Sequence, residues 1–160
     1  MATYVLVHGG GHGGWCYQRV ARLLRRAGHE VYAPSLSGMG EHSHQLRPDI
    51  DLDTQITDIV NLLHYEDLRD VVLAGHSYGG MVITGAADRA SERIGKLVYL
   101  DSVAPPNGLS LADIAGPLME EARADSKVID GVELVLFPDS SSVRQPGVRR
   151  VEGDVRESVR

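Results

Sequence analysis

The sequence has almost no cysteine: Cys16 is the only one among 160 residues. A single cysteine cannot form a disulfide within the chain, which excludes the disulfide-stapled secreted scaffolds. The N-terminus, Met1-Ala2-Thr3 followed directly by a short apolar run, also lacks the basic segment and cleavage site of a secretion signal. These two absences predict a reduced protein in the cytoplasm.

Long apolar runs and an excess of positive charge are absent as well. No apolar segment reaches the roughly 20 residues that a membrane-spanning helix needs. The 16 lysines and arginines are outnumbered by 22 aspartates and glutamates, and the formal net charge is −6. Without a basic stripe we expect no nucleic-acid partner, and the expected ligand is a small neutral or apolar molecule.

The sequence does contain a regular alternation of short apolar runs and helical patterns over residues 3–102. The apolar runs, expected as strands, are residues 4–7, 30–33, 70–74 and 96–100. The helical patterns are residues 15–27, a segment from Asp51 or Asp53 to Leu63, and a segment from Tyr78 to about Arg89. This rhythm is typical of βαβ units and predicts an α/β fold with a mostly parallel, doubly wound sheet. Right-handed crossovers predict the spatial order second, first, third and fourth strand.

The pattern loosens after Pro105-Pro106. Residues 111–124 are expected to be helical and residues 132–137 to form a strand, while residues 140–160 are polar with little periodicity. The segment from residue 34 to residue 48, rich in Ser, Gly and His, is expected to be a loop.

The strongest motif is Gly75-His76-Ser77-Tyr78-Gly79, which matches G-x-S-x-G between an expected strand and an expected helix. A serine on such a turn needs a strained backbone, and the residues two before and two after it must be small to avoid collisions. The turn raises the hydroxyl to a helix N-terminus, where negative charge is favoured. The motif predicts Ser77 as a nucleophile, with an incidental serine in a glycine-containing turn as the alternative.

A second motif is the glycine-rich turn of residues 8–14, directly after the first expected strand. Acyl transfer needs two backbone N–H donors, one from the residue after the nucleophile and one from the loop after an earlier strand. Tyr78 supplies the first donor and Gly10 is expected to supply the second. A phosphate-binding turn is the alternative, but the P-loop pattern G-x-x-x-x-G-K-[ST] is absent.

Four segments carry a resemblance to a known family: VLVHGGGHGGWC (residues 5–16), RAGH (26–29), LSGMGE (36–41) and VLAGHSYGGMV (72–82). In them the chain resembles the α/β-hydrolase superfamily, and within it the branch of plant methyl-ester hydrolases, hydroxynitrile lyases and their bacterial esterase relatives. The resemblance implies the α/β-hydrolase fold, attack of Ser77 on a small ester, no cofactor, and a mobile cap over the pocket. It implies that residues 1–106 form the N-terminal part of the core and residues 107–160 a partial cap and irregular tail.

The resemblance also implies a pocket lined by Gly9, His12, Trp15 and His76. Lyase members of the branch carry a threonine where Gly9 stands here, so this departure favours ester hydrolysis over cyanohydrin cleavage. Other apolar side chains fit either a pocket or ordinary core; they are Tyr17, Met39 and Met81. Cys16 is expected to be a small buried apolar side chain rather than a second nucleophile.

The histidines are the main departure from the family. In this fold the triad runs in the order Ser, Asp or Glu, then His. All seven histidines precede Ser77, at positions 8, 12, 29, 42, 44, 64 and 76. We therefore expect that no imidazole lies within hydrogen-bonding reach of Ser77 and that the chain is a C-terminally truncated hydrolase.

Acidic residues offer only weak candidates for the triad acid or for a metal. Asp101 follows the fourth expected strand at the carboxyl edge of the sheet, but a role in capping the turn of residues 102–106 is favoured. Asp130 and Asp139 are weaker. His42 and His44, beside Glu41, lack further ligands at usable spacing, so no metal site is expected.

The sequence thus predicts a carboxylic-ester hydrolase with Ser77 as nucleophile, impaired in this chain because the base is missing. Cyanohydrin cleavage and a non-catalytic, ligand-binding or relic protein are the alternatives. The expected partner is a small ester, and a homodimer is left open.

Overall fold

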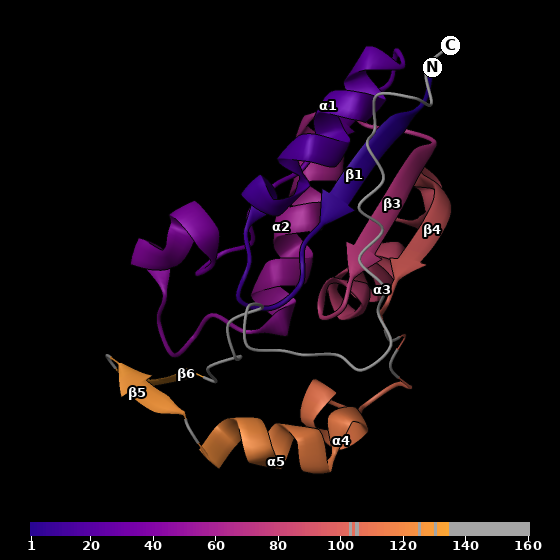
Figure 1. The fold of residues 1–160 in the computed structure, drawn as a ribbon. Helices are drawn as coiled ribbons and strands as arrows, with labels where there is room; N and C mark the ends of the chain where they lie inside the picture. Colours follow the sequence, from indigo (N-terminus) through magenta and orange to yellow (C-terminus); the bar gives the residue numbers. More distant parts are fainter. Residues whose placement is uncertain (103, 105, 125, 130, 135–160) are drawn as a thin grey trace, which may run out of the picture.

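A computed structural model describes residues 1–102, 104, 106–124, 126–129 and 131–134 of the chain. Its centre is a four-stranded parallel sheet made of β1 (Thr3–Val7), β2 (Glu30–Tyr32), β3 (Val71–His76) and β4 (Ile94–Leu100). The strands lie in the order β2-β1-β3-β4, which confirms the order predicted from the sequence. In the register, Val7 lies beside Gly75 and His76 beside Leu100, so the carboxyl ends of three strands meet at one edge (Figure 1).

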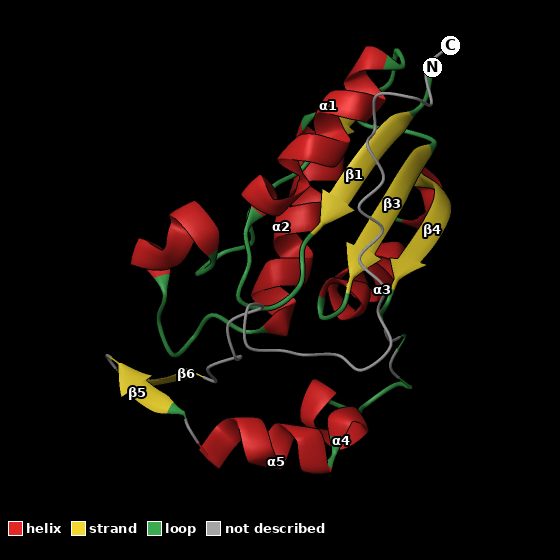
Figure 2. Cartoon of the chain, viewed as in Figure 1, coloured by secondary structure: helices red, strands yellow, loops and turns green. Residues whose placement is uncertain are grey.

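Helices cover both faces of this sheet. The short 3₁₀-helix η1 (Gly14–Tyr17) leads into α1 (Gln18–Arg26), which lies on one face, while α2 (Leu52–Tyr65) and α3 (Gly79–Arg89) lie on the other (Figure 2). Because successive side chains of a strand point to opposite faces, Leu6 packs in the α1 layer and Val5 in the α2–α3 layer. The sheet therefore has a core on each face, as doubly wound sheets do.

Local hydrogen bonds explain where two segments begin. The Asp51 carboxylate accepts the Thr54 N–H, so α2 begins at Leu52 with Asp51 as its N-cap, one of the two caps predicted. The segment of residues 34–48, expected as a loop, contains the 3₁₀-helix η2 (Gly40–Gln45). In its first turn the His42 N–H donates to the Met39 carbonyl. The segment has no apolar periodicity, so the sequence pattern did not predict this helix.

Beyond the carboxyl edge of the sheet lie α4 (Leu111–Ala115), α5 (Pro117–Ala124) and a hairpin of β5 (Lys127–Ile129) and β6 (Val132–Leu134) (Figure 1). The expected helical stretch of residues 111–124 is two helices because Gly116, at a φ of 49°, interrupts it. The three-residue strand β5 was not predicted. The expected strand at residues 132–137 begins at Val132, but its end after Leu134 and the expected tail lie outside the described residues.

In the described part of the chain, no helix is long and apolar enough to cross a membrane.

Candidate active site

Ser77 occupies the turn between β3 and α3, at the carboxyl edge of the sheet. Its φ is 50°, in the left-handed region that costs a non-glycine residue about 1–2 kcal/mol. Two hydrogen bonds from the end of the neighbouring strand hold this backbone: the Ser77 N–H donates to the Leu100 carbonyl at 3.3 Å, and the Ser102 hydroxyl donates to the Ser77 carbonyl at 2.6 Å. The hydroxyl of Ser77 is thus presented on an exposed, strained turn.

The two glycines flanking Ser77 are required by close packing. A Cβ on Gly75 would lie 2.5 Å from the Gly79 carbonyl oxygen, and a Cβ on Gly79 would lie 2.7 Å from the carbonyl oxygens of both Val7 and His8. Backbone atoms cannot yield at such distances without moving a strand or a helix. The geometry therefore accounts for small residues at both positions of the motif.

The glycine-rich turn after β1 lies directly against Ser77. A Cβ on Gly9 would be 2.9 Å from Nδ1 of His76 and 3.2 Å from Cβ of Ser77. Among the described residues, neither the Gly10 N–H nor the Tyr78 N–H donates to a protein acceptor. Both amides thus lack a protein acceptor in the described structure, while their convergence on a single oxyanion beside Ser77 stays a prediction.

His8 holds the glycine-rich turn in place. Its ring is fully buried; Nε2 accepts the Leu36 N–H at 3.1 Å, and Nδ1 lies 2.8 Å from the Gly9 carbonyl oxygen. Because Nε2 must be an acceptor, the proton sits on Nδ1, which donates to Gly9. Burial lowers the pKa of His8, so the ring stays neutral. Both nitrogens are engaged, so His8 is a structural residue.

His12 and its aromatic neighbours lie next to the same turn. Nδ1 of His12 is 3.0 Å from the Gly10 carbonyl oxygen, and its ring centroid is 5.8 Å from that of Trp15 and 6.4 Å from that of His76. The three residues expected to line a pocket, together with Gly9, are therefore neighbours around the glycine-rich turn.

In the described part of the chain no imidazole hydrogen bonds to the Ser77 hydroxyl, and the expectation that the triad base is missing stays a prediction. The ring of His29 accepts the Ala2 N–H and that of His44 contacts the Glu41 carbonyl, while His64 lies beside Arg93. All of these partners lie away from the Ser77 turn. Within the described ranges no group of three His, Cys, Asp or Glu side chains could hold a metal ion.

Asp101 lies at the end of β4, one residue past Leu100, which pairs with His76. Its φ is 44°, and its side chain makes no hydrogen bond within the described part of the chain. Its expected role in capping the following turn stays a prediction because residues 103 and 105 lie outside the described residues. Asp130 and Asp139 lie outside them too.

The apolar residues that fit either a pocket or the core are all buried or packed against the core. Tyr17 and Met81 are buried, and Met39 packs on the larger core. Cys16 is half-buried in the smaller core, and burial raises the pKa of its thiol, as expected for a structural cysteine.

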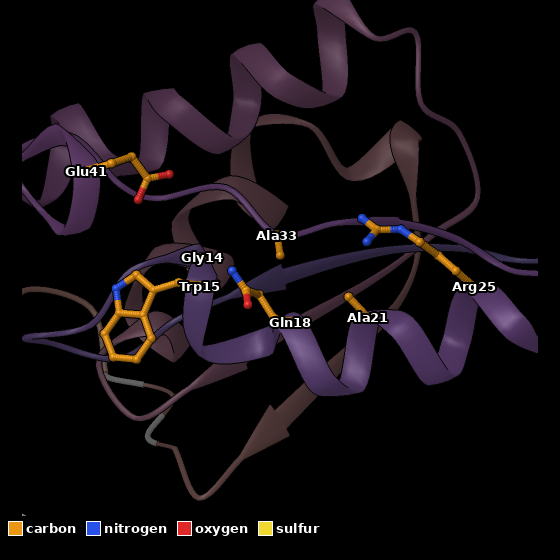
Figure 3. A pocket seen from close by; sticks show the side chains of 7 residues that line it. All are labelled: Gly14, Trp15, Gln18, Ala21, Arg25, Ala33 and Glu41. Carbon is orange, nitrogen blue, oxygen red and sulfur yellow. The ribbon is translucent and has the colours of Figure 1, made fainter.

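Trp15 lines a groove of about 610 Å³ between η1–α1 and the segment that follows β2 (Figure 3). Trp15 and Glu41 lie toward one end of this groove and Arg25 toward the other (Figure 3). The Ser35 hydroxyl donates to Glu41 and lowers the pKa of that carboxyl. Ser77 does not line this groove.

A polar connection between Tyr78 and α2 was missed in the sequence. The Tyr78 hydroxyl donates to Oε1 of Gln55 at 2.6 Å, and Gln55 is buried. Burial raises the pKa of Tyr78 to about 12, so the phenol stays protonated. The only available signal was a glutamine adjoining the apolar helix face that includes Ile56 and Ile59.

Comparison with protein families matches residues 4–155 to the model described as "Alpha/beta hydrolase family". A carbendazim hydrolyzing esterase from Nocardioides sp. (strain SG-4G) is 51% identical over 146 residues, which are 91% of this chain and 60% of that protein. Methylesterase 1 of Arabidopsis thaliana is 34% identical over 113 residues, 64% of this chain and 40% of that protein. The chain thus spans 60% or less of the length of these relatives.

A solved structure shows the same arrangement. It is an extracellular alpha/beta-hydrolase from a Paenibacillus species, described as sharing structural and functional homology with tobacco salicylic acid binding protein 2. The TM-score is 0.70 at 30% sequence identity, over 78% of this chain and 52% of that chain.

Proposed function

This chain belongs to the alpha/beta hydrolase family, and we propose that its protein is an esterase that hydrolyses small carboxylic esters through an acyl-enzyme on Ser77. The observation that carries the proposal is the strained Ser77 turn, at a φ of 50°, pressed against the glycine-rich turn. Relatives named as esterases support ester hydrolysis as the reaction class.

The proposed reaction begins when Oγ of Ser77 attacks the ester carbonyl and forms a tetrahedral intermediate. The oxyanion accepts hydrogen bonds from the amides of Gly10 and Tyr78, at the N-terminal end of α3, where the helix dipole also favours negative charge. The C–O bond to the alcohol then breaks, the alcohol leaves with a proton, and water hydrolyses the acyl-enzyme. No cofactor enters any of these steps.

The step that lacks a protein group is removal of the serine proton. Since no described imidazole reaches Ser77, attack by this chain depends on solvent as the base. We therefore propose turnover several orders of magnitude below that of a complete triad, arising from binding and oxyanion stabilisation alone.

Hydrolysis of p-nitrophenyl acetate, measured with and without added imidazole, tests this proposal. Imidazole in solution can act as the missing base, so we expect it to increase the Ser77-dependent rate by tenfold or more. Ser77→Ala gives the background and should show no such increase above free imidazole. Ser91→Ala, at an exposed serine away from the site, should behave as the parent chain. Carbendazim, named in one relative, is a second substrate to test.

Two other functions make different predictions in the same assay. A non-catalytic binding protein, favoured by the unpaired Ser77, would give equal rates for the parent chain and Ser77→Ala. A cyanohydrin lyase would release cyanide from mandelonitrile. The contact at Gly9 disfavours the lyase, because a threonine Cβ there would lie 2.9 Å from His76 Nδ1.

The cytoplasmic location and the small-molecule partner are part of the same proposal. A single cysteine suits a reducing compartment, and cell fractionation with an antibody against the chain tests the location. Sedimentation equilibrium distinguishes a monomer from a homodimer.

A further inference from the structure

We infer that Gln55 is a positioning residue for the oxyanion amide of Tyr78, acting from α2 through the Tyr78 phenol. The inference rests on the proposed function, because it assigns a task within the same ester-hydrolysing site. In the described part of the chain the Gln55 side chain hydrogen bonds to Tyr78 and Ser37 and not to Ser77, so we infer that its effect on catalysis passes through Tyr78.

The connection runs through three segments that are far apart in the sequence. The Tyr78 hydroxyl donates to Oε1 of Gln55 at 2.6 Å, and Nε2 of Gln55 donates to the Ser37 carbonyl at 2.9 Å. The Asp58 carboxylate accepts both the N–H of Ser37 at 2.7 Å and its hydroxyl at 2.9 Å. One hydrogen bond thus joins the nucleophile turn to α2, and three more join α2 to Ser37 in the segment after β2.

The Gln55 side chain is held in a fixed orientation. The residue is 4% exposed, so its amide cannot exchange these partners for water. Its carbonyl oxygen accepts from the Tyr78 hydroxyl and its amino group donates to the Ser37 carbonyl, and the reversed orientation would place two acceptors, Oε1 of Gln55 and the Ser37 carbonyl oxygen, against each other. Holding a buried amide in one orientation makes it a rigid anchor for the phenol.

Anchoring the phenol also fixes the Tyr78 amide. Tyr78 precedes the first residue of α3, and in the described part of the chain its N–H donates to no protein acceptor. The backbone nitrogen and Cβ of Tyr78 are both bonded to its Cα, so an anchored phenol restricts movement of the Cα and, through it, of the attached amide. A displacement of about 1 Å at a reacting site can reduce rates up to about a hundredfold.

A double-mutant cycle on the imidazole-assisted hydrolysis tests the inference. We expect Gln55→Met and Tyr78→Phe each to lower kcat about tenfold with KM changed less than twofold, because the oxyanion donor acts on the transition state. The double variant should be no slower than either single variant. Gln55→Glu, which keeps an acceptor for the phenol but loses the donor to Ser37, should be intermediate.

Gln45→Met is the matched control, since it makes the same change at an exposed glutamine with no hydrogen bond in the described structure. It should leave kcat at the parent value. Unchanged kcat in Gln55→Met, or losses that multiply in the double variant, would overturn the inference. A fall in thermal stability without a fall in kcat would do the same, because it would show that Gln55 is only structural.

A measurement independent of turnover decides the inference if the chain has no Ser77-dependent activity and the proposed function fails. In ¹H–¹⁵N NMR spectra, we expect Gln55→Met to shift and broaden the Tyr78 amide signal and to accelerate its hydrogen exchange relative to Gln45→Met. A Tyr78 signal that is the same in both variants contradicts the inference, whatever the activity.

Discussion

The segment of residues 3–90 and the segment of residues 107–134 are built in different ways. Every buried side chain of the described structure lies between Val5 and Ala90, and most of the apolar ones form the two cores on the faces of the sheet. The segment of residues 107–134 forms two helices and a hairpin, yet contributes no buried side chain among those described. The comparison separates two sources of order: core burial in the first segment, and local hydrogen bonds in the second.

The candidate active site depends on contacts within the first segment and on hydrogen bonds with the end of β4 and the residues just after it. Ser77 sits on a turn whose flanking glycines touch backbone, and whose carbonyl accepts from Ser102. In α4, by contrast, order comes from a capping box, in which Ser110 and Asp113 bond each other's backbone. Disturbing the first segment should therefore affect stability and catalysis together, while disturbing the second should not.

The largest difference is expected from removing an isoleucine in each segment. Ile59 in α2 is 0% exposed, so Ile59→Ala should lower the free energy of unfolding by about 2–5 kcal/mol through the cavity it leaves. Ile114→Ala in α4, at a half-buried position, should cost less than about 1 kcal/mol. Urea denaturation followed by circular dichroism measures both. Equal costs would show that the second segment shares the core after all.

A smaller difference is expected from adding one methyl group to a glycine. Gly79→Ala places a Cβ 2.7 Å from two carbonyl oxygens, so we expect a loss of about 1–3 kcal/mol and of Ser77-dependent turnover. Gly116→Ala, where no neighbouring atom lies within 4 Å, meets only backbone strain at φ 49° and ψ −125°, about 1–3 kcal/mol, and should leave turnover unchanged. Thermal unfolding and the ester assay, run in parallel, check the pair. Turnover retained in Gly79→Ala would contradict the close packing of the turn.

The smallest and most gradual difference is expected from acidification. Burial lowers the pKa of His8, so the folded state disfavours the protonated ring, and stability should fall as pH drops below about 6.5 toward the lowered value. The hydrogen bond from the Ser110 hydroxyl lowers the pKa of Asp113, so the α4 capping box should persist until the pH falls below the ordinary carboxyl range. Urea denaturation between pH 5 and 8 measures the first effect.

His8→Gln is the variant that isolates this dependence, with His12→Gln as the control at an exposed ring. The slope between pH 5 and 6.5 should shrink in the first and persist in the second. If His8→Gln does not fold, the His8 ring can be followed directly by NMR titration of the parent chain. A pKa at or above 6.5 would then contradict the buried, neutral ring.

The strand order and the position of Ser77 were predictable because they follow from strong, local signals. Four apolar runs separated by helical patterns leave few topologies, and G-x-S-x-G between a strand and a helix fixes the turn. The catalytic roles of Ser77, Gly10 and Tyr78 stay predictions.

Features that depend on side chains meeting across the fold were not predictable. The bond between Tyr78 and Gln55 joins residues 23 positions apart, and the position of Gln55 beside an apolar helix face does not identify its partner. The 3₁₀-helix η2 and strand β5 are too short to show periodicity. The structural role of His8, which links the glycine-rich turn to Leu36, likewise depends on a hydrogen bond between residues 28 positions apart.

The positive φ of Ser77 lowers the stability of the fold at the same residue that the proposed reaction requires. Glycine would occupy this backbone without strain but has no hydroxyl, so the reaction proposed for Ser77 requires the strained residue. In a lineage without the reaction, replacement of Ser77 by glycine would relieve the backbone strain and so raise the free energy of unfolding. Under the proposed function, the strain at Ser77 is a cost in stability that selection for activity offsets.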